Sequence, residues 1–186
     1  MEKKKRCAWC NPKNPIYVEY HDNEWGAMSF SDEYLYEMLI LESFQAGLSW
    51  ECVLNKRENF RTAFEGFDAL RVSLFDEGKV EELLLNKGII RNRRKITASI
   101  ENSRIFTEIV REFGSFICYI RSFWDGERLY EVGVTTNALS DAISKDLTRR
   151  GMRFVGSTII YSYLQAVGII YSHDENCYLY RRMGDL

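Results

Sequence analysis

Proline is scarce in this chain of 186 residues: Pro12 and Pro15 stand near the start and none follows. A body without proline favours helices over an all-β sandwich, which needs many turn-forming residues. Long apolar runs are also absent, since no stretch approaches the ~20 apolar residues that cross a bilayer. The cationic residues 1–6 are not followed by the apolar segment of an export signal. We therefore expect a cytoplasmic protein that does not enter a membrane.

The chain also lacks a large excess of either charge, because it has 25 Lys and Arg residues and 27 Asp and Glu residues, a net charge of −2. The chain is therefore not a polybasic or acidic tail protein. Its apolar share of 46% is ample for a closed core. Five cysteines, an odd number, are typical of reduced thiols or metal ligands rather than of a disulfide framework. We expect one domain spanning residues 1–186.

Apolar residues recur at helical spacing along most of the chain. Ser31, for example, can cap a helix on which Leu35, Met38 and Leu39 form one stripe. The helices expected from such patterns span residues 31–47, 49–64, 76–88, 92–114, 115–124, 137–150 and 157–167. The predicted fold class is all-α.

Residues 86–95 contain five cations and no anion, although the whole chain is nearly neutral. Gly88 lies here in a turn between two expected helices, which is typical of a helix-hairpin-helix near residues 80–100. The start of the second helix offers free backbone N–H groups to a phosphate, and Lys and Arg reinforce this binding. A solvated charged face is the alternative, and the same two interpretations apply to the smaller cationic run at residues 149–153.

Glu42 is an acid on an apolar stripe, since it follows Leu35, Met38 and Leu39 at the next helical position. An unpaired buried carboxylate is costly. Glu42 is therefore either paired or at the helix edge, or it lines a cavity where a ligand binds. Aromatic residues near this helix in the sequence are candidate cavity walls, although most aromatic residues of a helical core only pack. They are Trp9, Tyr17, Tyr20, Trp25 and Trp50.

The two histidines of the chain, His21 and His173, each have a cysteine at a spacing suited to a metal site. Cys177 follows His173 by four residues, and Cys7 precedes His21 by 14. Together they would supply four protein ligands from the two ends of the chain, and such an ion is structural. The alternatives are ordinary surface residues, or Cys10 as the ligand in place of Cys7.

Several motifs, taken in order, resemble one family over nearly the whole chain. They are Cys7-x-Trp9, PIYVEYHDNEWG at 15–26, LESFQAGLSW at 41–50, KRENF at 56–60, GIIRNRRKI at 88–96, GMRFVGSTI at 151–159, YSYLQAVG at 161–168 and His173-x3-Cys177. This sequence resembles the DNA-3-methyladenine glycosylase I family, of the helix-hairpin-helix glycosylase superfamily. The resemblance implies hydrolysis of the N-glycosidic bond of 3-methyladenine in alkylated double-stranded DNA, which leaves an abasic site without a lyase step.

The resemblance also implies roles for individual residues. Glu42 would be the catalytic residue, accepting hydrogen bonds from the base, and Leu48 would be the wedge that fills the gap left by the flipped nucleotide. The implied base-binding walls are Trp9, Tyr17, Tyr20 and Trp50. The implied contacts to the DNA backbone are Gly88, Ile90, Arg91, Arg93 and Lys95. The implied ligands of a structural Zn²⁺ are Cys7, His21, His173 and Cys177.

Some alternatives remain open at this point. Ser43 and Phe44 depart from the family pattern and could change the shape of the pocket, and Leu48 could be a core residue. A catalytically silent, zinc-stabilised DNA-binding module is the alternative function. We expect a monomer that uses neither a membrane nor a nucleotide cofactor.

Overall fold

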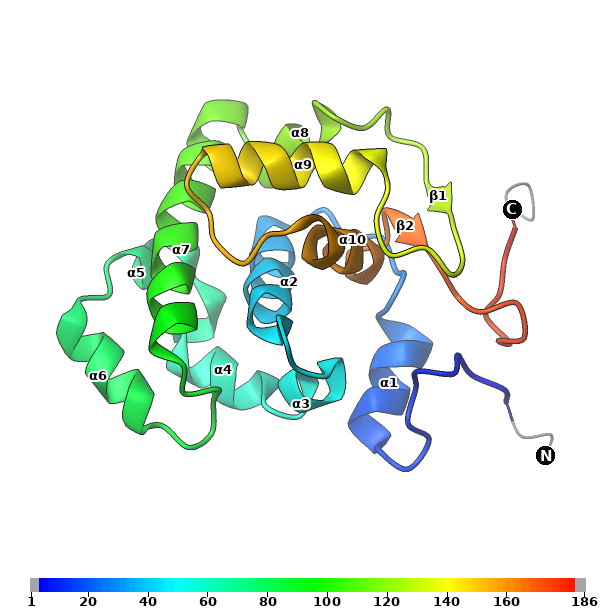
Figure 1. Ribbon diagram of the computed structural model, residues 1–186, viewed down its shortest axis with the longest axis horizontal. Helices are drawn as coiled ribbons and strands as arrows, with labels where there is room; N and C mark the ends of the chain where they lie inside the picture. The colour runs from blue at the N-terminus through cyan, green and yellow to red at the C-terminus, as the bar shows by residue number, and fades with distance from the viewer. Residues whose placement is uncertain (1–3, 183–186) are drawn as a thin grey trace.

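The computed structural model describes residues 4–182, and helices dominate it (Figure 1). The elements in chain order are α1 (Pro15–Asn23), α2 (Asp32–Gln45), α3 (Trp50–Leu54), α4 (Arg57–Ala63), the 3-10 helix η1 (Glu65–Phe67), α5 (Ala69–Ser73), α6 (Glu77–Leu85), α7 (Arg93–Phe113), α8 (Phe116–Arg121), β1 (Leu129–Tyr130), α9 (Ala138–Arg149), α10 (Ser157–Ala166) and β2 (Ile170–Tyr171). The predicted helical class is confirmed, with one addition. Strands β1 and β2 form a short parallel pair in which Leu129 lies opposite Ile170.

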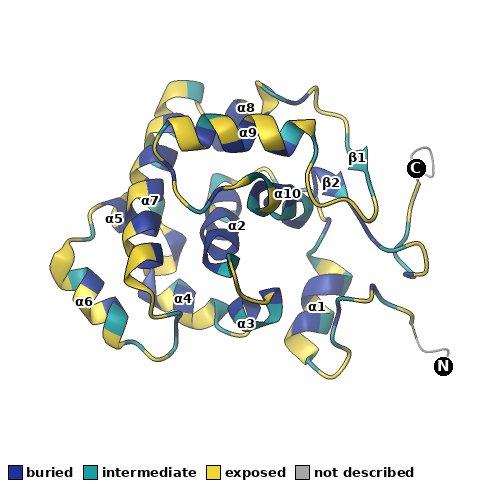
Figure 2. Ribbon diagram, viewed as in Figure 1, coloured by how far each residue is buried: buried dark blue, intermediate teal, exposed yellow. Residues whose placement is uncertain are grey.

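Helix α2 lies in the middle of the molecule and is buried at every position from Leu35 to Phe44 (Figures 1 and 2). Helices α3, α7, α8 and α10 all pack against it. A helix enclosed in this way is apolar around its whole circumference rather than along one stripe. The two acids within this segment, Glu37 and Glu42, are therefore the residues whose burial needs an explanation.

The predicted helices are present with ends shifted by a few residues, except that the one expected at 49–64 is divided. Helix α3 ends at Leu54 and α4 begins at Arg57, because the backbone of Lys56 (φ −106°, ψ 1°) leaves the helical region. The short helices α1 and α5 were not expected. No helix within residues 4–182 has the length and apolar character that crossing a bilayer requires.

Helices α6 and α7 form a hairpin at one end of the molecule, joined by residues 86–92 (Figure 1). Asn92 caps α7 by accepting a hydrogen bond from the backbone N–H of Lys95 at 3.2 Å. Gly88 sits tightly, because a Cβ there would lie 2.9 Å from Cγ of Asn59. Lys56 Nζ donates to the carbonyl of Gly88 at 3.3 Å. The hairpin turn is thus anchored on α4 and on the residue that precedes it.

The first and last segments of the described chain come close to each other beside α1 (Figure 1). The backbone N–H of Tyr178 donates to the carbonyl of Lys5 at 2.8 Å, and that of Ala8 donates to the Asp174 carboxylate at 2.6 Å. Segments that are more than 160 residues apart in sequence therefore share one local structure.

Candidate active site

A cavity of about 230 Å³ lies among α1, α2, α3 and α10. Its lining residues are Trp9, Tyr17, Tyr20, Trp25, Glu42, Gln45, Trp50, Ser162 and Gln165. The structure therefore brings the predicted catalytic residue and all four predicted base-binding residues to one cavity. It is smaller than the roughly 300–1,000 Å³ of pockets for drug-sized ligands, which suits a single heterocyclic base.

Glu42 is only 3% exposed, and its carboxylate has no hydrogen-bond partner among residues 4–182. Burial raises its pKa from the ordinary 4.5 to about 8. Glu37, the other acid buried in α2, is satisfied by Arg57 at 2.8 Å and Arg61 at 2.7 Å. Glu42 makes no such ion pair. Its burial therefore costs stability that no contact within the protein offsets.

The aromatic walls contact one another around the cavity. The ring centroids of Tyr20 and Trp50 lie 5.4 Å apart, and those of Trp9 lie 5.3 Å from Tyr17 and 4.8 Å from Trp25. The indole N–H of Trp50 is buried without an acceptor in the described chain. Aromatic faces attract cations, and the site adds an unpaired donor and an unpaired carboxylate. These features fit a flat, polar and cationic ligand.

Three polar residues of the cavity, Gln45, Ser162 and Gln165, were not singled out from the sequence. Gln45 lies one helical turn after Glu42 on α2, and the other two lie one turn apart on α10. Polar residues one turn apart within a buried helix are a signal that could have found them.

The departures Ser43 and Phe44 do not line the cavity. The Ser43 hydroxyl donates to the carbonyl of Leu39 at 2.8 Å, and the Phe44 ring packs on Phe60 with centroids 4.6 Å apart. Neither side chain therefore forms part of the cavity surface.

A cluster of four buried side chains lies behind the cavity wall: Cys7, His21, His173 and Cys177, whose potential ligand atoms are all within 4.8 Å of one another. Cys7 Sγ lies 3.4 Å from His173 Nδ1, and Cys177 Sγ lies 3.5 Å from His21 Nε2. A tetrahedral zinc ion with bonds of about 2.3 Å to sulfur and about 2.0 Å to nitrogen requires separations of about this size. The cluster could hold a metal ion.

Cys10 lies outside this cluster, because its thiol donates to the backbone carbonyl of Tyr17 at 3.7 Å. The alternative in which Cys10 replaces Cys7 does not fit the structure.

Neighbouring groups orient the two histidines. His21 Nδ1 lies 2.8 Å from the Asp22 carboxylate, and with its proton on Nδ1 the ring presents Nε2 to the cluster. Carboxylates commonly hold metal-binding histidines in this way. The rings also pack against the cavity wall, with His21 5.1 Å from Trp9 and His173 4.7 Å from Trp25.

Leu48 lies on the turn between α2 and α3, near the cavity, and is 41% exposed. Gly47 makes this turn possible by adopting φ +77°, and the Leu48 N–H donates to the carbonyl of Gln45 at 2.6 Å. Ser49 then caps α3 by accepting from Cys52 N–H at 3.2 Å. The interpretation of Leu48 as a core residue is therefore wrong.

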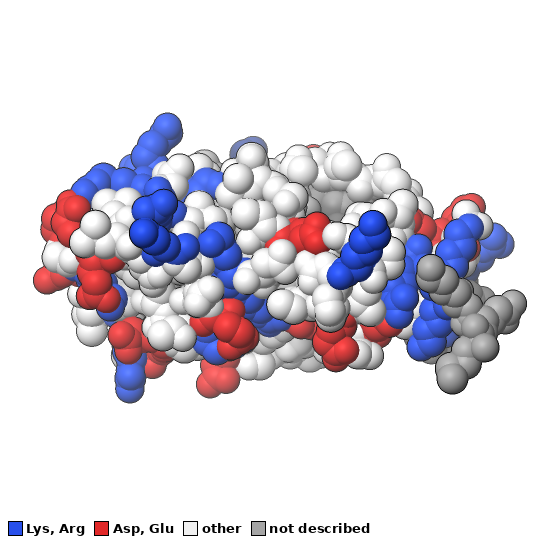
Figure 3. Space-filling view, turned by 90° about the horizontal axis from the view of Figure 1, so that it is seen from below, with Lys and Arg blue, Asp and Glu red and all other residues white. Residues whose placement is uncertain are grey.

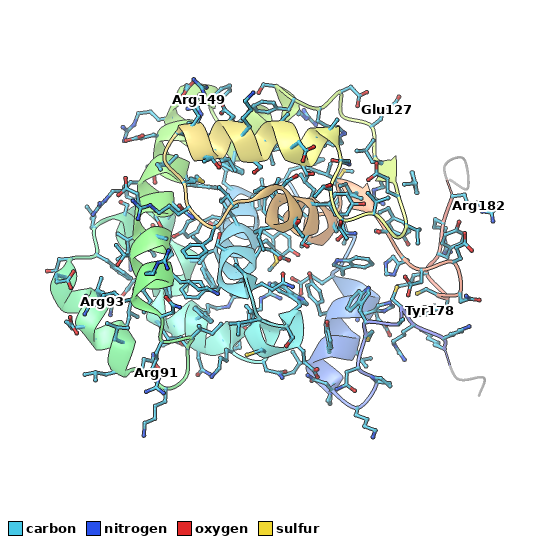
Figure 4. All side chains as sticks on the ribbon, viewed as in Figure 1. Arg91, Arg93, Glu127, Arg149, Tyr178 and Arg182 are labelled. Carbon is cyan, nitrogen blue, oxygen red and sulfur yellow. The ribbon has the colours of Figure 1, made fainter. Side chains whose placement is uncertain are left out.

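The cationic residues of the hairpin differ in their surroundings. Arg91 is exposed, whereas Arg93 pairs with Glu77 and Glu81 on α6; Figure 4 labels both arginines at the α6–α7 hairpin. Seen from below, Lys and Arg side chains stand out at this end of the molecule with acidic side chains beside them (Figure 3). Ile90 is half-buried against the core.

Lys95 requires a correction, because it does not face solvent. It is 7% exposed, and Nζ donates to the backbone carbonyls of Phe44 at 2.8 Å and Ala46 at 2.6 Å. The predicted phosphate contact of Lys95 is therefore wrong: its charged end is turned inward onto the end of α2.

Comparisons of the sequence with known proteins all identify one family. The family model described as methyladenine glycosylase matches residues 9–181. The chain is 42% identical over 182 residues to DNA-3-methyladenine glycosylase 1 of Escherichia coli, which covers 94% of this chain and 96% of that protein. It is 35% identical over 179 residues to DNA-3-methyladenine glycosylase of Haemophilus influenzae, with coverage of 92% and 96%.

Solved structures show the same fold. A crystal structure of 3-methyladenine DNA glycosylase I is similar with a TM-score of 0.90 at 42% identity, covering 95% of this chain and 100% of that one. A structure of 3-methyladenine DNA glycosylase I from Staphylococcus aureus, which addresses the recognition of 3-methyladenine, gives a TM-score of 0.87 at 29% identity. It covers 92% of this chain and 94% of that one.

Proposed function

The chain belongs to the methyladenine glycosylase family, and on this premise we propose that it hydrolyses the N-glycosidic bond of 3-methyladenine in alkylated double-stranded DNA. The products are the free base and an abasic site. The observation that carries the proposal is Glu42, an unpaired carboxylate buried in an aromatic cavity of base size. A silent DNA-binding module would have no use for this arrangement.

The chemistry suits a cavity with few reactive groups. Alkylation at N3 places a positive charge on the base while it is still attached to the sugar, so the leaving group needs no protonation by the enzyme. The aromatic rings favour such a cation, and the charge of the bound base would in turn favour the ionised form of Glu42, which binds it more strongly. An extruded base can enter the cavity, with the unpaired oxygens of Glu42 and the unpaired N–H of Trp50 available to hydrogen-bond it.

Attraction of the cationic base by Glu42 accounts for recognition first. As the bond breaks, positive charge moves from the base to the sugar, which becomes oxocarbenium-like. Only interactions that strengthen in this transition state raise the chemical rate. We therefore assign Glu42 to binding and selecting the base, and an additional effect on the rate requires that the carboxylate also stabilises the sugar cation.

The absence of a lyase step is consistent with the cavity lining. Lyase chemistry needs an amine nucleophile in the pocket, and the cavity formed by the described residues is lined by no lysine. The nearby Lys95 is engaged with two backbone carbonyls.

We assign DNA binding to the exposed Leu48 and to the α6–α7 hairpin. Leu48 would enter the gap left by the flipped nucleotide. Gly88, Ile90, Arg91 and Arg93 would contact phosphates without reading the base sequence, which suits an enzyme that must search all DNA. Arg91 is the stronger candidate for a phosphate contact, because Arg93 is already shared with two acids of α6.

The buried cluster is proposed to hold one structural zinc ion. Two thiolates and two imidazoles fill a tetrahedral shell, leaving no open position for water or substrate. The ion would tie the two ends of the chain together and support the wall formed by Trp9 and Trp25. It would take no part in the reaction. A monomeric state and a cytoplasmic location stay predictions.

The test compares the wild type with Glu42→Gln and, as a matched control, with Glu108→Gln at an exposed position of α7. Each protein is incubated with methylated duplex DNA, and the released bases are separated by chromatography. We expect the wild type and the control to release 3-methyladenine without strand cleavage. Glu42→Gln should release much less while binding DNA equally well. Binding without release by the wild type would support the silent module instead.

A further inference from the structure

We propose that Lys95 is a positioning residue for the wedge: it holds the end of α2 so that Leu48 is presented outward for insertion into DNA. This inference rests on the proposed function, because it assigns a role to Leu48 in that function. Lys95 itself would touch neither the base nor a phosphate.

The contacts of Lys95 are directed at one short segment. Its Nζ bonds to the carbonyls of Phe44 and Ala46, on either side of Gln45 and just before Gly47 and Leu48. The remaining carbonyl of this segment, that of Gln45, accepts from the Leu48 N–H at 2.6 Å. The three carbonyls at the end of α2 are therefore all engaged, and Lys95 supplies the donors for two of them.

A cation is well suited to this position. The last carbonyls of a helix lack partners within the helix and carry the negative end of its dipole. Helix α2 has no basic residue in its own last turn. Lys95 provides the missing charge from another helix, and an ammonium group has three donors, two of which are used here.

The burial of Lys95 follows from its place on α7. It lies one turn before Ser99 and two turns before Asn102, and these residues are also buried on the same helix. Burial lowers the pKa of the ammonium group, whereas its hydrogen bonds to two carbonyls favour the protonated form. A lysine placed here only for packing could be replaced by an apolar residue, whereas one that anchors the turn could not.

The arrangement links two DNA-binding features through one helix. The first residues of α7 form the phosphate-binding end of the hairpin, and the third residue of the same helix holds the turn that carries Leu48. Phosphate binding at the hairpin would therefore fix where the wedge meets the duplex.

The test uses Lys95→Met, which keeps the length of the side chain and removes the donors. Lys145→Met, at an exposed position of α9, is the matched control. The probe is a duplex with an abasic-site analogue and an adjacent 2-aminopurine, whose fluorescence rises when a wedge unstacks it. We expect Lys95→Met to weaken binding to this duplex roughly tenfold, the order expected when a charged hydrogen-bond donor is lost, and to reduce the fluorescence rise. The control should match the wild type.

A double-mutant cycle with Leu48→Ala separates positioning from a general structural effect. If Lys95 acts through Leu48, Lys95→Met should have little further effect on the fluorescence rise once Leu48 is removed. Free 3-methyladenine, titrated by tryptophan fluorescence, should bind Lys95→Met as it binds the wild type, and the salt dependence of DNA binding should not change. If Lys95→Met does not fold, Lys95→Gln retains two donors and should give an intermediate effect.

Additive effects in the cycle, or a Lys95→Met variant that behaves as the wild type, would overturn the inference. A salt slope reduced by about 1 would mean a phosphate contact instead. These readouts do not depend on catalysis. If the wild type inserts its wedge but releases no base, the proposed function is contradicted. The role of Lys95 is still decided by the binding and fluorescence measurements on its variants.

Discussion

Replacing the buried Glu42 with Gln should change how the stability of the protein depends on pH. In the folded protein its pKa is about 8, against 4.5 ordinarily, so the folded state keeps a proton that the unfolded chain releases. A group with a raised carboxyl pKa makes the protein less stable as pH rises between these two values. The raised pKa of Glu42 lowers the free energy of unfolding by about 3 kcal/mol at pH 7, and this loss approaches about 5 kcal/mol above pH 8.

The assay is urea unfolding at pH 5, 6, 7 and 8 with the metal content held constant. Gln does not titrate, so the free energy of unfolding of Glu42→Gln relative to the wild type should increase by about 3 kcal/mol from pH 5 to pH 8. The free energy of burying the introduced amide is the same at every pH, so it does not affect this change between pH 5 and pH 8. Glu108→Gln should run parallel to the wild type. Parallel curves for Glu42→Gln would refute the reasoning, because Glu42 would then be ionised or paired in the folded protein.

Three further predictions concern the hairpin and the metal cluster. Arg91→Gln should weaken binding to all duplexes alike and reduce the slope of log K against log salt by about 1; an unchanged slope would exclude a phosphate contact. Gly88→Ala should destabilise the protein by about 1–3 kcal/mol in urea unfolding, because the new Cβ would meet Asn59 at 2.9 Å, and the double variant with Asn59→Ala should recover part of the loss. Zinc analysis should find about one ion per chain; chelation or His173→Ala should lower the melting temperature and the affinity for free 3-methyladenine, and a protein that keeps both would contradict the structural role.

Helices in which apolar residues recur at regular helical spacing could be predicted from the sequence. The stripes at Leu35, Met38 and Leu39 and the long pattern of α7 identified their helices, and the same periodicity found Glu42 as an acid out of place. Helix α1 was not predicted as a helix. Its residues face the cavity on one side and the metal cluster on the other, so the polar and apolar positions do not separate into two faces.

Lys95 shows where the interpretation of charge failed. It stands in a cationic run beside a glycine turn, and the run was interpreted as a single surface. In the structure, Lys95 shares a stripe of α7 with Ser99 and Asn102, which are both buried. The rule that singled out Glu42 does not find Lys95, because the residues on its stripe are polar, whereas those before Glu42 are apolar. The partners of Lys95 are backbone carbonyls at the end of α2, and no side-chain pattern in the sequence reports them.

The joining of the two chain ends bears on how the protein is made. Ribosomes deliver the N-terminal part first, so Cys7 and His21 emerge long before His173 and Cys177. Until those last ligands arrive, the proposed metal shell behind Trp9 and Trp25 would be incomplete, and the wall that faces Glu42 would lack its support. A growing chain therefore carries the acid before it carries a finished pocket, and capacity to bind a base should appear only once synthesis has passed residue 177.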